Sequence, residues 1–226
     1  KVVYDPYANR WIFTACVDAR LPGSGTLLAV SQTSDPTGSW FRYRVDGDAA
    51  DLVWADYPGL GFNKDWIVVT MNMFDIGGAG AFNRTHAYIF SKAAVASGTL
   101  SFTLRSTAAA FTLIPAVTYD TNLSTLYLME TFNPGAGQLR LWSITGAVGA
   151  ETLAIVGTPT GSAFDSLPGV GNADFAPQAG STARIMNNDS RVQNMVYRNG
   201  TLWTVHNAFL PVGSGTRTAV QWWQVS

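Results

Sequence analysis

Aspartates in the long, glycine-rich segments of this sequence are the residues best suited to chemistry. Asp56, Asp174 and Asp189 all lie in such segments. Hydrolysis of a glycosidic bond needs two carboxyl groups about 5–10 Å apart, one on each side of the bond. Asp56 with either Asp174 or Asp189 is therefore the candidate catalytic pair of a site like that of a glycoside hydrolase.

The same side-chain oxygens suit two other roles. Ca²⁺ prefers several carboxylate and carbonyl oxygens, which Asp174, Asn188 and Asp189 would supply. Alternatively, these residues only cap turns, and Asp189 forms a structural ion pair with Arg191. The candidate substrate-binding residues flank the acids in the sequence and are Tyr57, Arg191 and Asn194.

Composition excludes several classes of protein. Charged residues make up 13% of the 226 residues and the formal net charge is −1, which argues against a nucleic-acid binder and a disordered chain. No apolar run is long enough to span a membrane. The sole cysteine, Cys16, permits no internal disulfide, and we expect it to be a small buried apolar residue. Scarce lysine with abundant Ser, Thr, Asn, Gly and Trp favours a secreted, extracellular protein.

One pattern occurs four times: a short strand that ends in an aromatic residue, a polar turn, and a second strand. The four aromatic residues are Tyr4, Phe62, Tyr119 and Tyr197. The turns are rich in Asp, Asn, Pro and Gly, which are hairpin-turn residues. Two further alternating segments follow in each of the first three repeats and one follows in the fourth. Four antiparallel strands per repeat predict β-propeller blades, with a β-sandwich as the alternative.

The predicted fold is therefore an all-β propeller with four recognisable blades, the last without its outer strand. Residues 1–226 form a single propeller domain or part of a larger one. Because the first strand starts abruptly and the last blade lacks a strand, we expect missing blades or a further chain to complete the propeller. The blades cover about residues 1–46, 56–105, 113–156 and 191–226, and a long loop covers 157–190.

Propeller connectivity separates tight turns on one face from longer loops on the other, and most of the acidic residues fall on the loop face. Long loops on one rim carry function more often than tight turns. Asp56 lies two residues before Pro58, which opens an innermost strand, and Arg191 lies two residues before Gln193, which holds the same place in the fourth repeat. We therefore expect Asp56 and Arg191 near the axial mouth, on different blades.

Aromatic residues in loop-face segments are candidates for stacking on sugar rings, although burying loops against the rim is their commoner use. They are Trp54, Phe74, Phe82, Phe132, Phe164, Phe175 and Phe209. On the last predicted strand, Trp222 and Trp223 point to opposite faces, so we expect one of them in the core.

The segment Thr33-Ser-Asp35-Pro-Thr-Gly38-Ser-Trp40 resembles the Asp-box of sialidases and related propellers, whose pattern is S/T-x-D-x-G-x-x-W. In that family the Asp-box is a structural turn away from the active site, so the resemblance implies a turn. Together with Asp56-Tyr-Pro58 and Asn188-Asp-Ser-Arg-Val-Gln-Asn194, this segment is similar to uncharacterised secreted bacterial β-propeller proteins. That resemblance implies a propeller with further blades.

Two hypotheses for function follow. The first is a secreted propeller that binds a glycan or another extracellular ligand on its acidic loop face, with hydrolysis of the glycan as the enzymatic version. The alternative is a non-catalytic structural or adhesion propeller, braced by Ca²⁺ or by capped loops.

Overall fold

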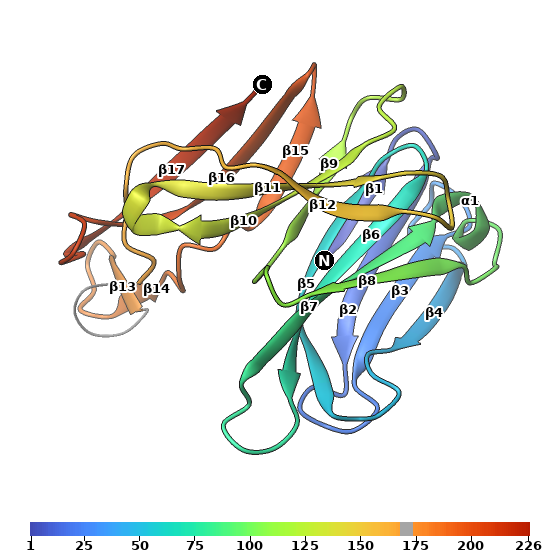
Figure 1. The fold of residues 1–226 in the computed structure, drawn as a ribbon, viewed down its shortest axis with the longest axis horizontal. Helices are drawn as coiled ribbons and strands as arrows, with labels where there is room; N and C mark the ends of the chain where they lie inside the picture. Colours follow the sequence, from blue (N-terminus) through green and yellow to red (C-terminus); the bar gives the residue numbers. More distant parts are fainter. Residues whose placement is uncertain (168–173) are drawn as a thin grey trace.

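The computed structural model describes residues 1–167 and 174–226, with the side chains of 174 and 175 left out, and it is built almost entirely of antiparallel strands (Figure 1). Three four-stranded meanders are followed by a three-stranded one, and we call them blades 1 to 4. The fold is all-β and propeller-like. Blade 1 contains β1 (Val2–Asp5), β2 (Arg10–Val17), β3 (Gly25–Ser31) and β4 (Trp40–Asp46), and blade 2 contains β5 (Val53–Phe62), β6 (Trp66–Asp75), β7 (Phe82–Ser91) and β8 (Phe102–Thr107). Blade 3 contains β9 (Ile114–Thr118), β10 (Leu126–Asn133), β11 (Gln138–Thr145) and β12 (Thr152–Gly157). Blade 4 contains β15 (Asn194–Arg198), β16 (Thr201–Leu210) and β17 (Arg217–Val225).

Other regular structure is scarce. The helix α1 (Lys92–Val95) is one turn long, and the side chain of Ser91 caps it by accepting a hydrogen bond from the backbone N–H of Ala94. A 3-10 helix, η1, covers Pro134–Ala136. None of the helices in the described residues has the length and apolar character needed to cross a membrane.

The segment predicted as a long loop over 157–190 contains a small hairpin, which corrects that prediction. Its strands are β13 (Asp174–Pro177) and β14 (Arg184–Met186), and they pair with each other antiparallel. Strands of three and four residues are too short to show an alternating pattern in the sequence, which is why the hairpin was not predicted.

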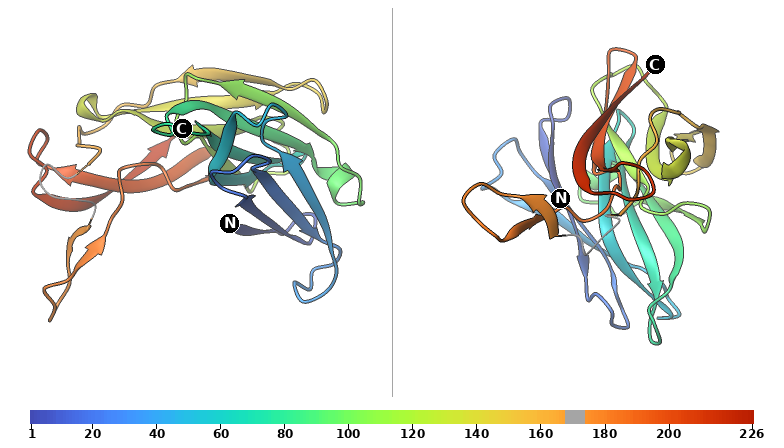
Figure 2. Two further views of the ribbon diagram at one scale, coloured as in Figure 1. Left: turned by 90° about the horizontal axis from the view of Figure 1, so that it is seen from below. Right: turned by 90° about the vertical axis from the view of Figure 1, so that its left-hand side faces the viewer.

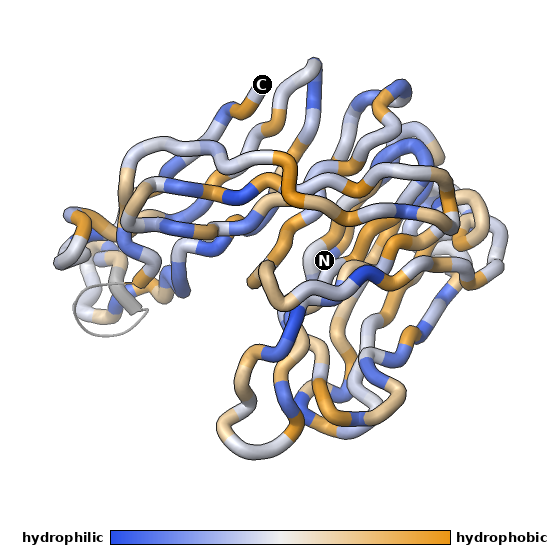
Figure 3. Tube along the Cα trace, in the orientation of Figure 1, coloured by the Kyte–Doolittle hydropathy of each residue, from blue (hydrophilic) through white to orange (hydrophobic). Residues whose placement is uncertain are grey.

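Apolar side chains on the facing surfaces of neighbouring blades hold the blades together. One cluster joins blades 1 and 2 and includes Ile12, Leu28 and Phe62. Corresponding clusters join blade 2 to blade 3 and blade 3 to blade 4. Figure 3 shows apolar residues recurring along the strands of these blades. Sheet-on-sheet packing of this kind buries one face of each terminal blade and both faces of blades 2 and 3.

The innermost strands of blades 2, 3 and 4 lie side by side and run parallel. Strand β9 pairs with β15 on one side, where Val117 is opposite Val196, and with β5 on the other, where Phe62 is opposite Val117. The Lys1 side chain donates a hydrogen bond to the backbone oxygen of Gln193 at 2.7 Å, which connects the start of blade 1 to the start of blade 4. The outer parts of blades 1 and 4 nevertheless diverge and leave a gap (Figure 2).

Both blades beside this gap expose apolar side chains. The face of blade 4 that points away from blade 3 carries Trp203 and Val205, with Val220 and Trp222 exposed by 70% and 66%. The face of blade 1 that points away from blade 2 carries exposed Val2 and Phe13, beside a shallow hollow of about 710 Å³. Trp223 is buried next to exposed Trp222, so the prediction that these two residues face opposite sides is confirmed.

The turn between β3 and β4 has the polar contacts expected of the Asp35 segment. Asp35 accepts hydrogen bonds from the backbone N–H of Thr37 at 2.8 Å and from its hydroxyl at 2.7 Å. The Trp40 indole N–H donates to the backbone oxygen of Pro36 at 3.0 Å. The aspartate therefore caps its own turn, and the tryptophan closes over it.

Candidate functional site at the start of the innermost strands

Parallel innermost strands bring their starts to one end of the molecule. Tyr57 lies within β5 at the irregularity between Asp56 and Gly59, Thr112 precedes β9, and Arg191 precedes β15. Three segments that are far apart in the sequence therefore converge, because parallel neighbours begin at the same edge of a sheet. We call this region the mouth, and it comprises Asp56, Tyr57, Thr112, Asp189, Arg191 and Gln193.

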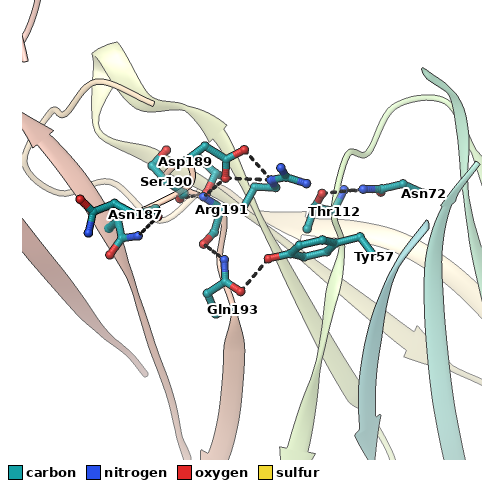
Figure 4. Close-up of polar contacts among 10 residues, drawn as sticks. Tyr57, Asn72, Thr112, Asn187, Asp189, Ser190, Arg191 and Gln193 are labelled. Atoms are coloured by element: carbon teal, nitrogen blue, oxygen red, sulfur yellow. Dashed lines mark hydrogen bonds and ion pairs between the residues drawn. The ribbon is translucent and has the colours of Figure 1, made fainter. Parts of the chain in front are cut away.

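A chain of hydrogen bonds connects blade 2 to blade 4 at the mouth (Figure 4). The Tyr57 hydroxyl donates to Oε1 of Gln193 at 2.6 Å, and Nε2 of Gln193 donates to the backbone oxygen of Arg191 at 3.3 Å. The Nε–H of Arg191 donates to both carboxylate oxygens of Asp189, at 2.8 and 2.6 Å. The Arg191 guanidinium carbon lies 4.6 Å from the centre of the Tyr57 ring. Tyr57 and Arg191, from different blades, thus form one polar and aromatic unit.

The segment that leads into β9 supplies the third side of the mouth. The Phe111 ring centre lies 5.3 Å from the Arg191 guanidinium carbon, and the side chain is 37% exposed. Its backbone N–H donates to Oε2 of buried Glu130 at 2.7 Å. The next residue, Thr112, is held by Asn72, which accepts from its backbone N–H at 2.8 Å and donates to its hydroxyl at 2.7 Å. Buried polar groups therefore fix the position of Phe111.

Left-handed backbone occurs in the same three segments, as it does at five other non-glycine residues of the described chain. Tyr57, Thr112 and Asn188 have φ values of +56°, +57° and +57°. This left-handed region is unusual for non-glycine residues, and it is least favourable for a β-branched residue such as Thr112. Strained residues persist only where their surroundings over-determine them, and they cluster at functional sites. Thr112 is the only β-branched residue among the described residues with this conformation, and its strain therefore supports the mouth as the candidate site.

An aromatic row leads from the rim of blade 2 to the mouth and consists of Trp54, Phe74, Phe82 and Phe111. Trp54 and Phe74 stack with their ring centres 5.3 Å apart. Phe74 and Phe82 pack edge to face at 5.9 Å, and Phe82 and Phe111 do so at 5.0 Å. Phe111 then meets Arg191, so the row and the mouth are continuous.

The carboxylates of Asp56 and Asp189 both act on the mouth electrostatically. Burial raises the pKa of Tyr57 most, and the charges of Asp189 and Asp56 raise it further, against the effects of Gln193 and Arg191. Burial alone would lower the pKa of Arg191, but the hydrogen bonds and charge of Asp189, with the charge of Asp56, raise it overall. Burial and the charge of Asp56 also raise the pKa of Cys16. The side chain of Cys16 is half-buried, whereas the sequence predicted a buried one.

Four of the predicted site residues meet at the mouth: Asp56, Tyr57, Asp189 and Arg191. Asn194 does not join them. It is exposed at the start of β15 and lies with Trp203 and Trp222 on the open face of blade 4. The reason is strand geometry, because successive residues of a strand point to opposite faces.

The predicted calcium ligands are Asp174, Asn188 and Asp189. The side chain of Asp174 lies outside the described residues, and Asn188 is half-buried. The described part of the chain contains no group of three or more His, Cys, Asp or Glu side chains arranged to hold a metal ion. Both carboxylate oxygens of Asp189 already accept hydrogen bonds from Arg191.

The loop-face aromatic residues predicted to stack on sugars differ in their exposure. Trp54, Phe74 and Phe82 belong to the aromatic row, and Phe132 is exposed under Arg140, whose guanidinium carbon is 3.6 Å from the ring centre. Phe164 and Phe209 are fully buried, so their role is packing. The side chain of Phe175 lies outside the described residues.

Sequence reasoning did not identify Gln193 and Phe111 as site residues. Gln193 takes the place that Pro58 and Pro115 hold in the other repeats, so a polar residue at a position otherwise held by proline was an available signal. Phe111 lies four residues before Pro115 and gave no signal, because its position depends on Asn72 and Glu130, which are distant in the sequence.

Comparisons with known proteins find little. No family model matches the sequence, and no curated protein matches it. Among solved structures, the chain is similar to one described as xylan beta-1,4-xylosidase from Bacillus Halodurans C-125, with a TM-score of 0.42 and 12% identity. The similarity covers 96% of this chain and 39% of that chain, so this chain spans about two fifths of the xylosidase. A likeness of this quality assigns neither a family nor an activity.

Proposed function

We propose that this chain is a carbohydrate-binding, propeller-like module and that its ligand lies across the mouth and the aromatic row. The observation that carries the proposal is the continuity of the two, from Trp54 through Phe111 to Arg191 and Tyr57. The composition, low in lysine, supports secretion as part of the same proposal.

The chemistry of the site suits sugars. A pyranose ring presents C–H groups that pack on aromatic faces, and half-exposed aromatic residues offer apolar area with little loss of side-chain entropy. Its hydroxyl groups both donate and accept, and Asp56, Arg191 and Gln193 supply partners of both kinds. Apolar stacking beside a few fixed polar groups is the usual composition of a small-ligand site.

Binding is better supported than hydrolysis. A glycosidase needs two carboxyl groups free to act as acid and as base or nucleophile. Asp189 gives both of its oxygens to Arg191, so it serves to position that side chain. Asp56 remains a candidate catalytic carboxylate, since among the described residues it accepts a hydrogen bond only from the adjacent backbone N–H of Tyr57, at 2.8 Å.

Calorimetric titration of the whole chain with a panel of soluble oligosaccharides tests the proposal. We expect binding by the wild type and at least tenfold weaker binding by Phe111→Ala, or about 1.4 kcal/mol. Tyr7→Ala is the matched control, because Tyr7 is an exposed aromatic residue in the turn between β1 and β2, and its affinity should be unchanged. Failure of every oligosaccharide to bind, or equal binding by Phe111→Ala, contradicts the proposal.

The same panel separates binding from catalysis. We expect no release of reducing ends by the wild type. Release that Asp56→Asn abolishes, without a change in melting temperature, would instead make the chain a glycoside hydrolase that uses Asp56.

A further inference from the structure

Arg191 has hydrogen-bond donors at the mouth that none of the described residues accepts from. Its Nε–H is taken by Asp189, but Nη1 and Nη2 have no hydrogen-bond partner among the described residues. Neither nitrogen is among the buried polar atoms without a partner, so solvent reaches both. The Arg191 side chain as a whole is 21% exposed. The outer edge of the guanidinium is therefore open to a ligand.

The position of this open edge is fixed by the protein. Asp189 holds the guanidinium through Nε and also accepts from the Arg191 backbone N–H at 3.0 Å. Both backbone polar groups of the preceding residue, Ser190, are hydrogen-bonded. Its N–H donates to the backbone oxygen of Ser166 at 3.0 Å, and its oxygen accepts from the Thr131 hydroxyl at 2.8 Å. A guanidinium positioned before binding loses little entropy when a ligand arrives.

The aromatic neighbours of Arg191 decide how a ligand can approach. Tyr57 and Phe111 lie 4.6 and 5.3 Å from its guanidinium carbon, and neither ring competes for the Nη hydrogens as a carboxylate would. A planar guanidinium whose two terminal nitrogens are free matches the two oxygens of a carboxylate. The formal charges of Asp56, Asp189, Arg191 and Lys1 cancel, so an incoming anion meets no net negative charge.

We propose that Arg191 binds the carboxylate of an acidic sugar through Nη1 and Nη2, while the sugar ring packs beside Phe111. The ligand class is thus a uronic-acid-containing glycan. This inference rests on the proposed function and specifies the ligand of the same site, since a neutral sugar would leave the outer edge of the guanidinium to hydroxyl groups alone.

Matched pairs of ligands test the inference on the unmodified protein. The probes are trigalacturonate with its methyl ester, and a xylo-oligosaccharide with and without a glucuronic acid branch. Methyl esterification removes the charge and keeps the sugar. For at least one pair, we expect the acidic form to bind at least tenfold more tightly, with the difference shrinking in 0.5 M NaCl because salt screens charge.

The Arg191→Lys variant tests the geometry of the contact, because lysine keeps the charge and loses the two-pronged donor set. We expect it to bring the affinity for the acidic form to within about threefold of that for the neutral form. Arg44→Lys, in an exposed ion pair with Asp18, is the matched control and should keep the preference. If Arg191→Lys does not fold, the comparison of acid and ester on the wild type still decides the matter.

The outcomes separate this inference from the proposed function. Equal affinity for acid and neutral partners, or binding of neutral oligosaccharides only, overturns the acidic-sugar inference and leaves carbohydrate binding standing. Absence of binding by every sugar, acidic and neutral, overturns both. A preference for the acid that survives in Arg191→Lys overturns the role of Arg191.

Discussion

Lys92 at the turn end of the blades and Arg191 at the mouth are both cations paired with an aspartate, yet their surroundings differ. Lys92 is buried, forms an ion pair with fully buried Asp5, donates to the backbone oxygen of Asn63 at 2.8 Å, and lies 5.0 Å from the centre of the Phe62 ring. Arg191 is partly exposed, and two of its nitrogens have no hydrogen-bond partner in the part of the chain that the structure describes.

The difference teaches how to distinguish a structural ion pair from a ligand-binding one. At the turn end the protein itself satisfies the cation, and nothing remains for a ligand. At the mouth the aspartate only positions the cation, and nearby Thr112 is a β-branched residue with a left-handed backbone. Strain that the surrounding contacts hold in place, as Asn72 holds Thr112, is expected where the site has a use beyond stability.

Removing Lys92 should have the largest effect on stability. Lys92→Met leaves the buried Asp5 carboxylate without its counter-charge, and breaking a buried ion pair costs about 3–5 kcal/mol. Urea unfolding should show this loss, while glycan affinity of the folded protein stays unchanged. Lys64→Met, which breaks the more exposed pair with Asp65, should cost under about 1 kcal/mol. Equal losses in the two variants would contradict the comparison.

Acid should destabilise the protein through His86, which lies in β7. Burial lowers the pKa of His86 to about 4, and the charge of Arg84 contributes. The ordinary histidine pKa is about 6.5, so the unfolded state binds the proton more readily, and stability present above pH 6.5 is lost as the pH falls toward 4.

At 1.36 kcal/mol per pKa unit, this loss is about 3 kcal/mol. Unfolding by urea at several pH values measures it. His86→Gln should flatten the curve between pH 6.5 and 4, and an unchanged slope in that variant would exclude His86 as the cause.

Asn72→Ala should have an intermediate effect and connect stability to binding. The substitution leaves the buried backbone N–H of Thr112 unpaired, which costs about 2 kcal/mol. Because Thr112 then loses the contacts that hold its left-handed backbone, Phe111 should shift and glycan affinity should fall. Asn122→Ala, at an exposed turn, is the control and should change stability by less than about 0.5 kcal/mol. Full glycan affinity in Asn72→Ala would show that Phe111 is positioned by other contacts.

Chelation should have the smallest effect. Arg191 occupies the oxygens of Asp189, so we expect EDTA to leave the melting temperature unchanged. A drop of several degrees that Ca²⁺ reverses would instead support calcium binding by Asn188, Asp189 and Asp174.

The sequence by itself determined the repeated strands and the convergence of their starts. Alternating apolar residues and turn residues define strands locally, and the equivalence of Pro58, Pro115 and Gln193 predicted that Asp56 and Arg191 would come together.

Tertiary structure alone decided which side chains are free. Three features of the site depended on how the strands pack together. Both carboxylate oxygens of Asp189 accept hydrogen bonds from Arg191, Asn194 faces away from the mouth, and Phe111 completes the aromatic row. The short strands β13 and β14 could not be predicted from the sequence, because three or four residues are too few to show an alternating apolar pattern. Local periodicity specifies strands, whereas the partners of a polar side chain are set only when separate strands pack together.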